Sequence, residues 1–223
     1  MLYGTMSSHS SHLQVKSAPL PRWTQLSHRR LQTWPSALTK NNALLASPLP
    51  EWLRVPIIEP HFDKLGIFND APHQAPNHVL VNEYRPGQGI MPHEDGAAYY
   101  PLVATVSLGA PIVLDIYNKH AKDDPAAKIG DAASTENPPR YRILQEERSL
   151  LVTRGKMYTD FLHGIAETTR DENLGPDSIC NWELLRDKEA YQHGWFERET
   201  RISLTYRDVL HVAKIGNTMK FLR

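Results

Sequence analysis

Seven short segments of the chain alternate apolar and polar residues, or run apolar with β-branched and aromatic side chains, as β-strands do. Each is bounded by Gly, Pro or Asn, residues that commonly form turns. The predicted strands are 77–84, 102–109, 111–118, 141–147, 148–155, 158–165 and 201–209. Because helical patterns are few after residue 70, the predicted fold class is mainly β, either a sandwich or a jelly roll with short flanking helices.

Three regions depart from the strand pattern. Before the first predicted strand, two prolines interrupt an apolar stretch, so we expect short helical pieces there that pack Trp52, Phe62 and Leu65 inward. Residues 119–139 are polar and predict a long surface hairpin loop. Residues 166–200 predict a polar insert with one short helix near its middle, and a long insert in a compact domain is usually functional or disordered.

Composition limits the class of protein. The 223 residues can form one domain with a substantial core, and 25 basic residues balance 25 acidic ones, so no global field marks a nucleic-acid or membrane protein. Cys180 is the only cysteine, which excludes an internal disulfide and favours a reducing compartment. We find no bilayer-length apolar run and no secretory signal pattern, so the expected location is cytoplasm and nucleus, with no membrane partner.

The charge is unevenly distributed. Residues 1–50 contain no Asp or Glu, and within them Trp23, Arg29, Arg30 and Trp34 interleave basic and aromatic side chains. Such a pattern could contact a phosphate chain and stack a base. A partly mobile N-terminal arm is the alternative, and it is favoured for roughly the first fifteen residues.

The sequence "PHEDG" places His93 and Asp95 two residues apart in a tight turn. Two interpretations stay open: solvated turn residues, or two ligands of one metal ion. Positions i and i+2 at a strand end point the same way, so both side chains could face one ion. His163, in the strand-like "FLHGI", is the best third ligand, although a core histidine bonded to a carbonyl group would fit that sequence equally.

Two histidines and one carboxylate leave coordination positions open on a metal, which suits non-haem Fe(II) in oxygenases. Zinc hydrolases often carry the H-E-x-x-H helix, which is absent from this sequence. An oxygenase of this kind also needs a place for a dicarboxylate co-substrate. The expected feature is an inward-facing arginine on a late strand, able to hold a carboxylate in a bidentate pair.

The segment "RISLTYRDV" supplies such arginines. Arg201, Ser203 and Arg207 alternate with apolar residues and therefore share one strand face, although a surface strand with solvated arginines is the alternative. The strand that leads into the His93 turn carries Asn82 and Tyr84 on one face. An amide and a phenol there could complete the hydrogen bonds around the same dicarboxylate.

The ordered set N-x-Y, H-x-D, H-G-I and R-x-S-L-T-x-R resembles the AlkB family of Fe(II)- and 2-oxoglutarate-dependent dioxygenases. The resemblance extends from about Pro21 to Asp208 and resolves the ambiguity at His93 in favour of a metal. It implies a double-stranded β-helix, or jelly roll, with the metal between its two sheets. It also implies oxidative decarboxylation of 2-oxoglutarate with O₂, coupled to removal of an N-methyl group as formaldehyde.

The resemblance assigns two sets of ligands to this chain. The implied Fe(2+) ligands are His93, Asp95 and His163. The implied 2-oxoglutarate ligands are Arg201, Tyr84 and Ser203 at the distal carboxylate, with Arg207 and Asn82 nearer the metal. The sequence departs from the family at Ser203, where Asn is frequent, and at Ala97, where the bacterial repair enzyme has an Asp that contacts the flipped base.

Three functions follow as hypotheses. The first is demethylation of a nucleobase in RNA or DNA, with residues 1–50 as a basic arm and nucleotide-recognition lid and residues 51–223 as the dioxygenase domain of a monomer. The second is the same oxygenase chemistry on a protein or small molecule. The third is a non-catalytic nucleic-acid-binding module. The residues before "PRWTQLS" do not resemble the family's first strand and helix, which suggests an N-terminally shortened chain.

Overall fold

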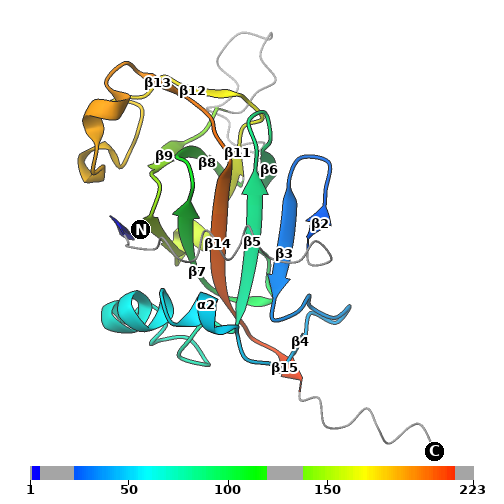
Figure 1. Ribbon diagram of the computed structural model, residues 1–223. Coiled ribbons are helices and arrows are strands. Elements are labelled where there is room, and N and C mark those ends of the chain that lie inside the picture. The colour runs from blue at the N-terminus through cyan, green and yellow to red at the C-terminus, as the bar shows by residue number, and fades with distance from the viewer. Residues whose placement is uncertain (1, 6–22, 120–137, 214–223) are drawn as a thin grey trace, which may run out of the picture.

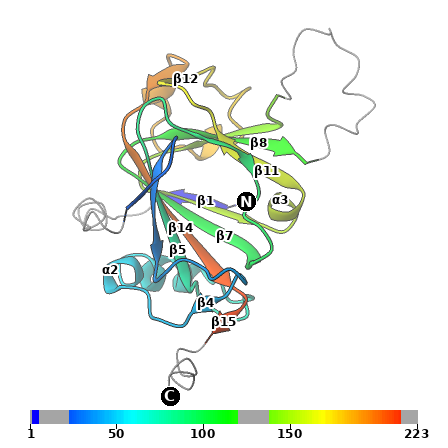
Figure 2. The same cartoon turned by 90° about the vertical axis from the view of Figure 1, so that its right-hand side faces the viewer.

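The computed structural model describes residues 2–5, 23–119 and 138–213. Within them, a seven-stranded and a four-stranded antiparallel sheet lie one over the other, as Figure 2 shows. Apolar side chains of both sheets form the core between them, among them Tyr84 and Leu151 from the larger sheet and Leu114 and Ile165 from the smaller. This arrangement confirms the predicted jelly roll.

The larger sheet contains the strands that run through the middle of the molecule in Figure 1. Its order is β1 (Leu2–Thr5), β10 (Ser149–Arg154), β7 (Tyr99–Leu108), β14 (Arg201–Val209), β5 (His78–Tyr84), β3 (Arg30–Trp34) and β2 (Thr24–Gln25). The smaller sheet has the order β6 (Ile90–His93), β11 (Phe161–Ile165), β8 (Ile112–Asn118) and β9 (Tyr141–Gln145).

Strand β14 lies at the centre of the larger sheet, and all nine of its residues are buried. Its apolar residues Ile202, Leu204 and Tyr206 belong to the core on the outer face of the sheet. Four polar residues alternate with these and face the smaller sheet, because successive side chains of a strand point to opposite sides: Arg201, Ser203, Thr205 and Arg207. The inward-facing arginines expected from the sequence are therefore observed, and the alternative of solvated arginines is excluded.

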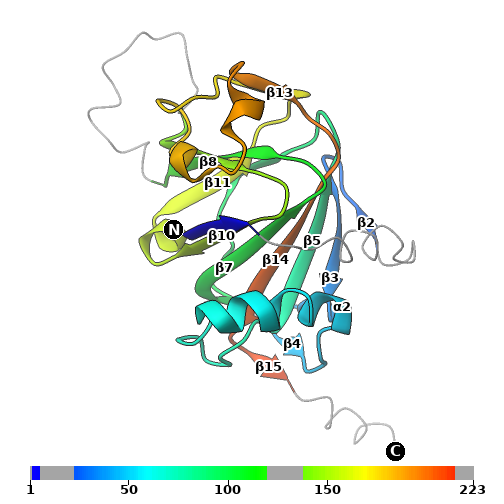
Figure 3. The same ribbon diagram turned by 60° about the vertical axis from the view of Figure 1, so that its left-hand side comes forward.

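Short helices cover the outer face of the larger sheet, as Figure 3 shows for α2 (Glu51–Arg54) and the segment after it. The π-helix η2 (Ile58–Asp63) contributes Phe62, whose ring meets that of Tyr206 edge-on at 4.9 Å. Phe62 and, in part, Trp52 pack inward as expected. Leu65 does not, since it is 63% exposed. A π-helical turn is wider than an α-helical one and shifts the phase of the residues that follow it.

The polar insert covers the outer face of the smaller sheet. Leu174, Ile179 and Leu185 of the insert pack against Val113 and Leu144 in a third apolar cluster. Two strands near its ends, β12 (Arg170–Glu172) and β13 (Trp195–Glu197), form an antiparallel pair. The short helix predicted in its middle is instead two 3-10 turns, η4 (Trp182–Leu184) and η5 (Lys188–Tyr191).

A buried ion pair holds the insert in place. Arg198 donates from Nε and Nη2 to the two carboxylate oxygens of Asp171, at 2.7 and 2.8 Å. Its Nη1 donates to the Ala166 carbonyl oxygen at 2.6 Å. Both charged side chains are almost fully buried, at 3% and 4% exposure, so the pair has little contact with solvent.

Each of the seven predicted strands is observed, apart from its ends and with one larger difference, while further strands such as β3 and β6 were not predicted. The strand predicted at 158–165 begins only at Phe161, because Gly155, at a φ of 57°, turns the chain into helix α3 (Lys156–Thr159). The loop predicted at 119–139 lies mostly outside the described residues, but the antiparallel pairing of β8 with β9 on either side of it agrees with a hairpin.

Parts of the N-terminal fifty residues belong to the larger sheet. Strand β1 pairs with β10 at one edge, while β2 and β3 extend the other edge beyond β5. Near the C-terminus, β15 (Val212–Ala213) pairs in parallel with β4 (Leu44–Leu45). The division at residue 50 stays a prediction. No helix in the described ranges is long and apolar enough to cross a membrane.

Candidate active site

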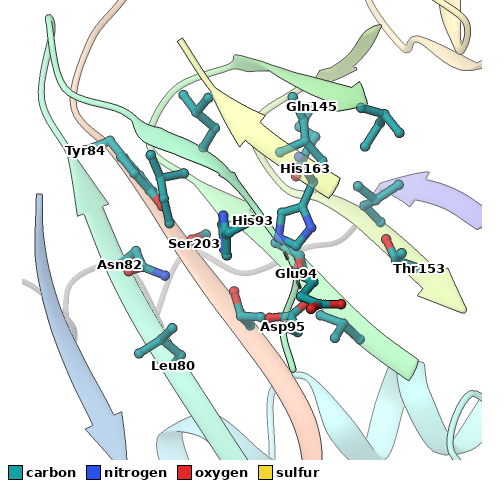
Figure 4. Close-up of a pocket in the computed structure, with 18 of the residues that line it drawn as sticks. Leu80, Asn82, Tyr84, His93, Glu94, Asp95, Gln145, Thr153, His163 and Ser203 are labelled. Carbon is teal, nitrogen blue, oxygen red and sulfur yellow. Dashed lines mark ion pairs between the residues drawn. The ribbon is translucent and has the colours of Figure 1, made fainter. Parts of the chain in front are cut away.

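A cavity of about 270 Å³ lies between the two sheets. All eight of the implied Fe(2+) and 2-oxoglutarate ligands line it, and Figure 4 shows several of them pointing into it from strands β5, β11 and β14. These residues are Asn82, Tyr84, His93, Asp95, His163, Arg201, Ser203 and Arg207. Residues more than a hundred positions apart in the chain therefore meet in one place.

The pairing of β5 with β14 builds one wall of the cavity. In this register Arg201 lies opposite Tyr84, and Ser203 lies opposite Asn82. Opposite residues of an antiparallel pair point to the same side of the sheet, so the two alternating polar sets combine into one surface. The sequence expectation that these strands are companions is confirmed.

The pairing of β6 with β11 brings the two histidines together. His93 lies opposite His163, and their ring centroids are 4.4 Å apart. The two strands approach closely beside this pair: a Cβ atom on Gly89 would lie only 2.3 Å from the Ile165 carbonyl oxygen. Gly89, directly before β6, is therefore required where the chain passes close to the end of β11.

Asp95 lies between His163 and Arg207. Its Oδ1 accepts a short hydrogen bond from Arg207 Nη2, and its Oδ2 is 3.9 Å from His163 Nε2. In the described part of the chain no three His, Cys, Asp or Glu side chains are close enough together, as they stand, to hold a metal ion. The donor chemistry nevertheless fits Fe(II), because two imidazoles and one carboxylate converge on one cavity.

Both histidines have an imidazole nitrogen suited to binding a metal. Burial lowers the pKa of His163 to about 4, against the opposing effect of Asp95, so its ring is neutral near pH 7. His93 Nδ1 donates to the Met91 carbonyl oxygen at 2.9 Å. This hydrogen bond places the proton on Nδ1 and leaves the lone pair of Nε2 available.

Arg201 is a buried cation without a carboxylate partner. Its side chain is 2% exposed, and among the described residues its hydrogen bonds go only to neutral groups. Nη2 donates to Ser107 Oγ at 2.8 Å and to Gln145 Oε1 at 3.0 Å, while buried Nε has no partner in the described structure. Burial lowers its pKa to about 10, which leaves it charged near pH 7. An unpaired buried cation that lines a cavity is suited to binding an anion.

Tyr84 lies beside this arginine, whose guanidinium carbon is 5.9 Å from the centre of the phenol ring. Burial raises the pKa of Tyr84, against the effect of the nearby arginines Arg201, Arg29 and Arg207. The phenol is therefore protonated near neutral pH and can donate a hydrogen bond to an anion in the cavity.

Several residues of the site were not identified from the sequence. Ser107 and Gln145 contact Arg201, as described above. Tyr158 donates from its hydroxyl to the Gly96 carbonyl oxygen at 2.8 Å, and Lys119 forms an ion pair with Glu94. Both contacts fix the turn that carries Asp95. A lone Tyr and Lys outside any motif gave no sequence signal of this role.

The basic and aromatic residues of the N-terminal region separate into two groups. Arg29 lines the cavity and donates from Nε to Asn82 Oδ1 at 3.1 Å. Arg30 forms an ion pair with Glu83 at 2.7 Å, and its guanidinium lies 4.2 Å from the centre of the Trp23 ring. Trp34 packs edge-on against Trp52 in the outer core. Of the four, Arg29 is the one that lines the cavity.

Protonation of His78 is expected to destabilise the protein as the pH falls from about 6.5 to about 4. This β5 residue is 2% exposed, and burial with the nearby Arg207 charge lowers its pKa to about 4, against the opposing effect of Ser36. The unfolded chain then binds a proton that the folded chain excludes, so stability is complete above pH 6.5 and is lost towards pH 4. The expected loss is about 3 kcal/mol.

Urea denaturation of the parent and of His78→Gln at several pH values measures this effect. The difference in unfolding free energy between the two should change across the window, because the variant lacks the titrating group. Parallel curves for parent and variant between pH 6.5 and pH 4 would contradict the assignment to His78.

The comparisons with known proteins agree with this geometry. Residues 5–207 match the 2OG-Fe(II) oxygenase superfamily, and the chain belongs to that family. It is thus an Fe(II)- and 2-oxoglutarate-dependent oxygenase, a class whose chemistry uses Fe(2+), 2-oxoglutarate and O₂.

Individual relatives narrow the similarity to AlkB proteins. A Danio rerio protein named "Probable RNA/DNA demethylase ALKBH6" is 39% identical over 211 residues, which cover 94% of this chain and 82% of that protein. The Xenopus tropicalis protein "tRNA (carboxymethyluridine(34)-5-O)-methyltransferase alkbh8" is 28% identical over 61% of this chain and 19% of its own. The solved structure of OsALKBH1 has a similar fold, with a TM-score of 0.54 at 13% identity, over 93% of this chain and 97% of that one. The AlkB resemblance seen in the sequence is confirmed.

Proposed function

We propose that this protein removes methyl groups from nucleobases in RNA or DNA as an Fe(II)- and 2-oxoglutarate-dependent demethylase. The observation that carries the proposal is the buried, unpaired Arg201 in the same cavity as His93, Asp95 and His163. A cation and a set of metal-binding side chains in one cavity suit a co-substrate that both binds a metal and bears a second carboxylate. The similarity to a protein named as a probable RNA/DNA demethylase supports the substrate class.

The residues divide the work in the following way. His93, Asp95 and His163 would hold Fe(II), which when bound supplies the activation of O₂. Arg207 donates to one oxygen of Asp95 and so orients the other oxygen towards His163. A carboxylate fixed by an arginine has fewer orientations to lose when it binds a metal.

The paired strands β5 and β14 would bind the co-substrate. Arg201 would form a bidentate pair with the distal carboxylate of 2-oxoglutarate, with the hydroxyls of Tyr84 and Ser203 as further donors. Asn82 and Arg207 lie further along the same wall, on the side of Asp95, and would hold the end nearer the metal. The lining also includes the apolar side chains of Leu114, Ile116 and Leu151.

Anaerobic titration of the Fe(II)-loaded protein with 2-oxoglutarate tests the site itself. A visible metal-to-ligand charge-transfer band should appear in the parent. If it does, formaldehyde release from methylated RNA and DNA oligonucleotides tests the substrate class. A band without release from any oligonucleotide would overturn the nucleobase assignment and favour a protein or small-molecule substrate. A folded protein without the band would overturn the oxygenase site.

Arg29→Ala is expected to weaken oligonucleotide binding and to flatten its dependence on salt. Arg29 lines the cavity from the edge of the larger sheet and is held by Asn82 rather than by an acid. If it contacts a phosphate, its removal lowers the slope of log affinity against log salt by about 1. The measurement is a fluorescence-anisotropy titration at several salt concentrations.

Arg54→Ala is the matched control, because Arg54 lies in α2 on the outer helical layer and pairs with Glu59. Its slope should equal that of the parent. Equal slopes for all three proteins would remove Arg29 from the nucleic-acid interface.

We further propose a monomer that acts in cytoplasm and nucleus, which size-exclusion chromatography and imaging of a tagged chain would test.

A further inference from the structure

The amide of Gln145 occupies the position in which a carboxylate would neutralise Arg201. Gln145 is the last residue of β9 in the smaller sheet, while Arg201 lies in β14 of the larger sheet. Its Oε1 accepts from Arg201 Nη2 at 3.0 Å and from Ser107 Oγ at 3.1 Å. Because Arg201 also donates to Ser107 Oγ, the three side chains form a closed triangle of hydrogen bonds.

The whole triangle is inaccessible to solvent. Ser107 is 0%, Gln145 is 1% and Arg201 is 2% exposed. The described hydrogen bonds hold the guanidinium by one nitrogen only, Nη2. Buried Nε has no partner in the described structure. The arrangement orients the cation without supplying a negative charge.

A second buried arginine three residues away shows the contrast. Arg198 has both oxygens of Asp171 as partners, at 2.7 and 2.8 Å. The carboxylate next to Gln145 in sequence is directed away from the cavity: Glu146 accepts from the backbone N–H groups of Arg186 and Asp187. At the end of β9 an amide is thus directed towards Arg201, and the acid that follows it is directed towards the insert.

We propose that Gln145, supported by Ser107, is a positioning residue that makes the cavity select a dicarboxylate. The amide holds Arg201 in place and leaves its charge to be neutralised by the distal carboxylate of the co-substrate. This inference rests on the proposed function, since it concerns the same co-substrate site. It predicts that a negative charge at position 145 competes with the distal carboxylate for Arg201. The contacts of the rest of the co-substrate should be unaffected.

Gln145→Glu tests the proposal, because glutamate has the same shape and keeps an acceptor facing Arg201. Two ligands are titrated into Fe(II)-loaded protein without oxygen, by calorimetry and by the charge-transfer band. They are 2-oxoglutarate and 2-oxopentanoate, which has a methyl group in place of the distal carboxylate. Gln145→Glu should bind 2-oxoglutarate about 100-fold more weakly than the parent and 2-oxopentanoate equally well. The thermal midpoint of the metal-free variant should be no lower than that of the parent.

Gln32→Glu is the matched control, because Gln32 is also 1% exposed but lies in β3 and does not line the cavity. It should leave both ligand affinities unchanged. If Gln145→Glu does not fold, Gln145→Met serves instead: it removes the acceptor, and 2-oxoglutarate should bind about 10-fold more weakly with 2-oxopentanoate unaffected.

Parent-like 2-oxoglutarate binding by the position-145 variant would overturn the inference and leave the proposed function intact. Equal weakening of both ligands would also overturn it, because a merely structural role would disturb the whole cavity. A parent that binds neither ligand would overturn the proposed function together with this inference.

Discussion

Arg198→Met is expected to lower the free energy of unfolding by about 3–5 kcal/mol, because it leaves a buried carboxylate without its partner. Asp171 receives two hydrogen bonds from Arg198, and its side chain is 4% exposed. The substitution also removes the donor to the Ala166 carbonyl oxygen. Urea denaturation followed by circular dichroism gives the change in free energy.

Two comparisons separate burial from charge. The exposed pair Arg54–Glu59, with side chains 50% and 49% exposed, is chemically similar, and Arg54→Met should lower stability by less than about 1 kcal/mol. The double variant Arg198→Met/Asp171→Leu should recover much of the loss, since no charge is then left buried. Equal losses for Arg198→Met and Arg54→Met would contradict the reasoning.

His163→Ala is expected to abolish Fe(II) binding and 2-oxoglutarate turnover, with an activity loss well above about 100-fold. Replacing only the groups that support a metal ligand commonly lowers affinity or activity by about 10–100-fold, and loss of a ligand is more severe. The ring lines the cavity opposite His93 and is neutral near pH 7. Iron content after desalting and the charge-transfer band are the measurements.

The folded state should survive this change, because the side chain of His163 is 27% exposed and lines a cavity rather than a packed core. His61→Ala is the control: this histidine lies in η2 on the helical layer and should keep parent-level iron and turnover. Iron retained by His163→Ala at the level of the parent would show that the metal is held elsewhere.

The sequence was sufficient wherever local alternation decides the structure. The predicted strand at 201–209 matches β14 residue for residue, because polar and apolar residues alternate without a break from Arg201 to Arg207. The motifs around His93, His163 and Arg201 likewise identified the residues that line the cavity. The side of a strand to which a side chain points follows from its position in the sequence. The local pattern is therefore enough to predict both the strand and the residues that line the cavity.

Contacts between distant strands could not be predicted in the same way. Ser107 and Gln145 meet Arg201 across 94 and 56 positions of sequence, and they do so because of strand register and of how the two sheets are placed. No motif surrounds either residue. Their role became visible only once the partners of Arg201 were known.

The alternation of side chains along β3 also explains why the basic and aromatic residues of the N-terminal region do not all face the cavity. Arg30 and Trp34 lie opposite Glu83 and Val79, which face the helical layer, while Leu31 lies opposite the cavity residue Asn82. Arg29, one position before the strand, continues the cavity-facing series. The number of charges in the sequence does not distinguish Arg29 from Arg30. Their positions relative to β3 do, because they place the two side chains on opposite faces of the sheet.

The complete burial of β14 limits how the length of this chain can change. One extra residue within the strand would reverse the facing of every residue on one side of it, placing polar side chains in the apolar helical layer and apolar ones in the cavity, so fold and site would fail together. The insert at 166–200 ends directly before the strand, and much of its length is turns with their own contacts. Insertions and deletions that arise in related chains should therefore collect in the exposed turns of that segment, away from its buried residues, and protein engineers who need a graft point should choose those turns for the same reason.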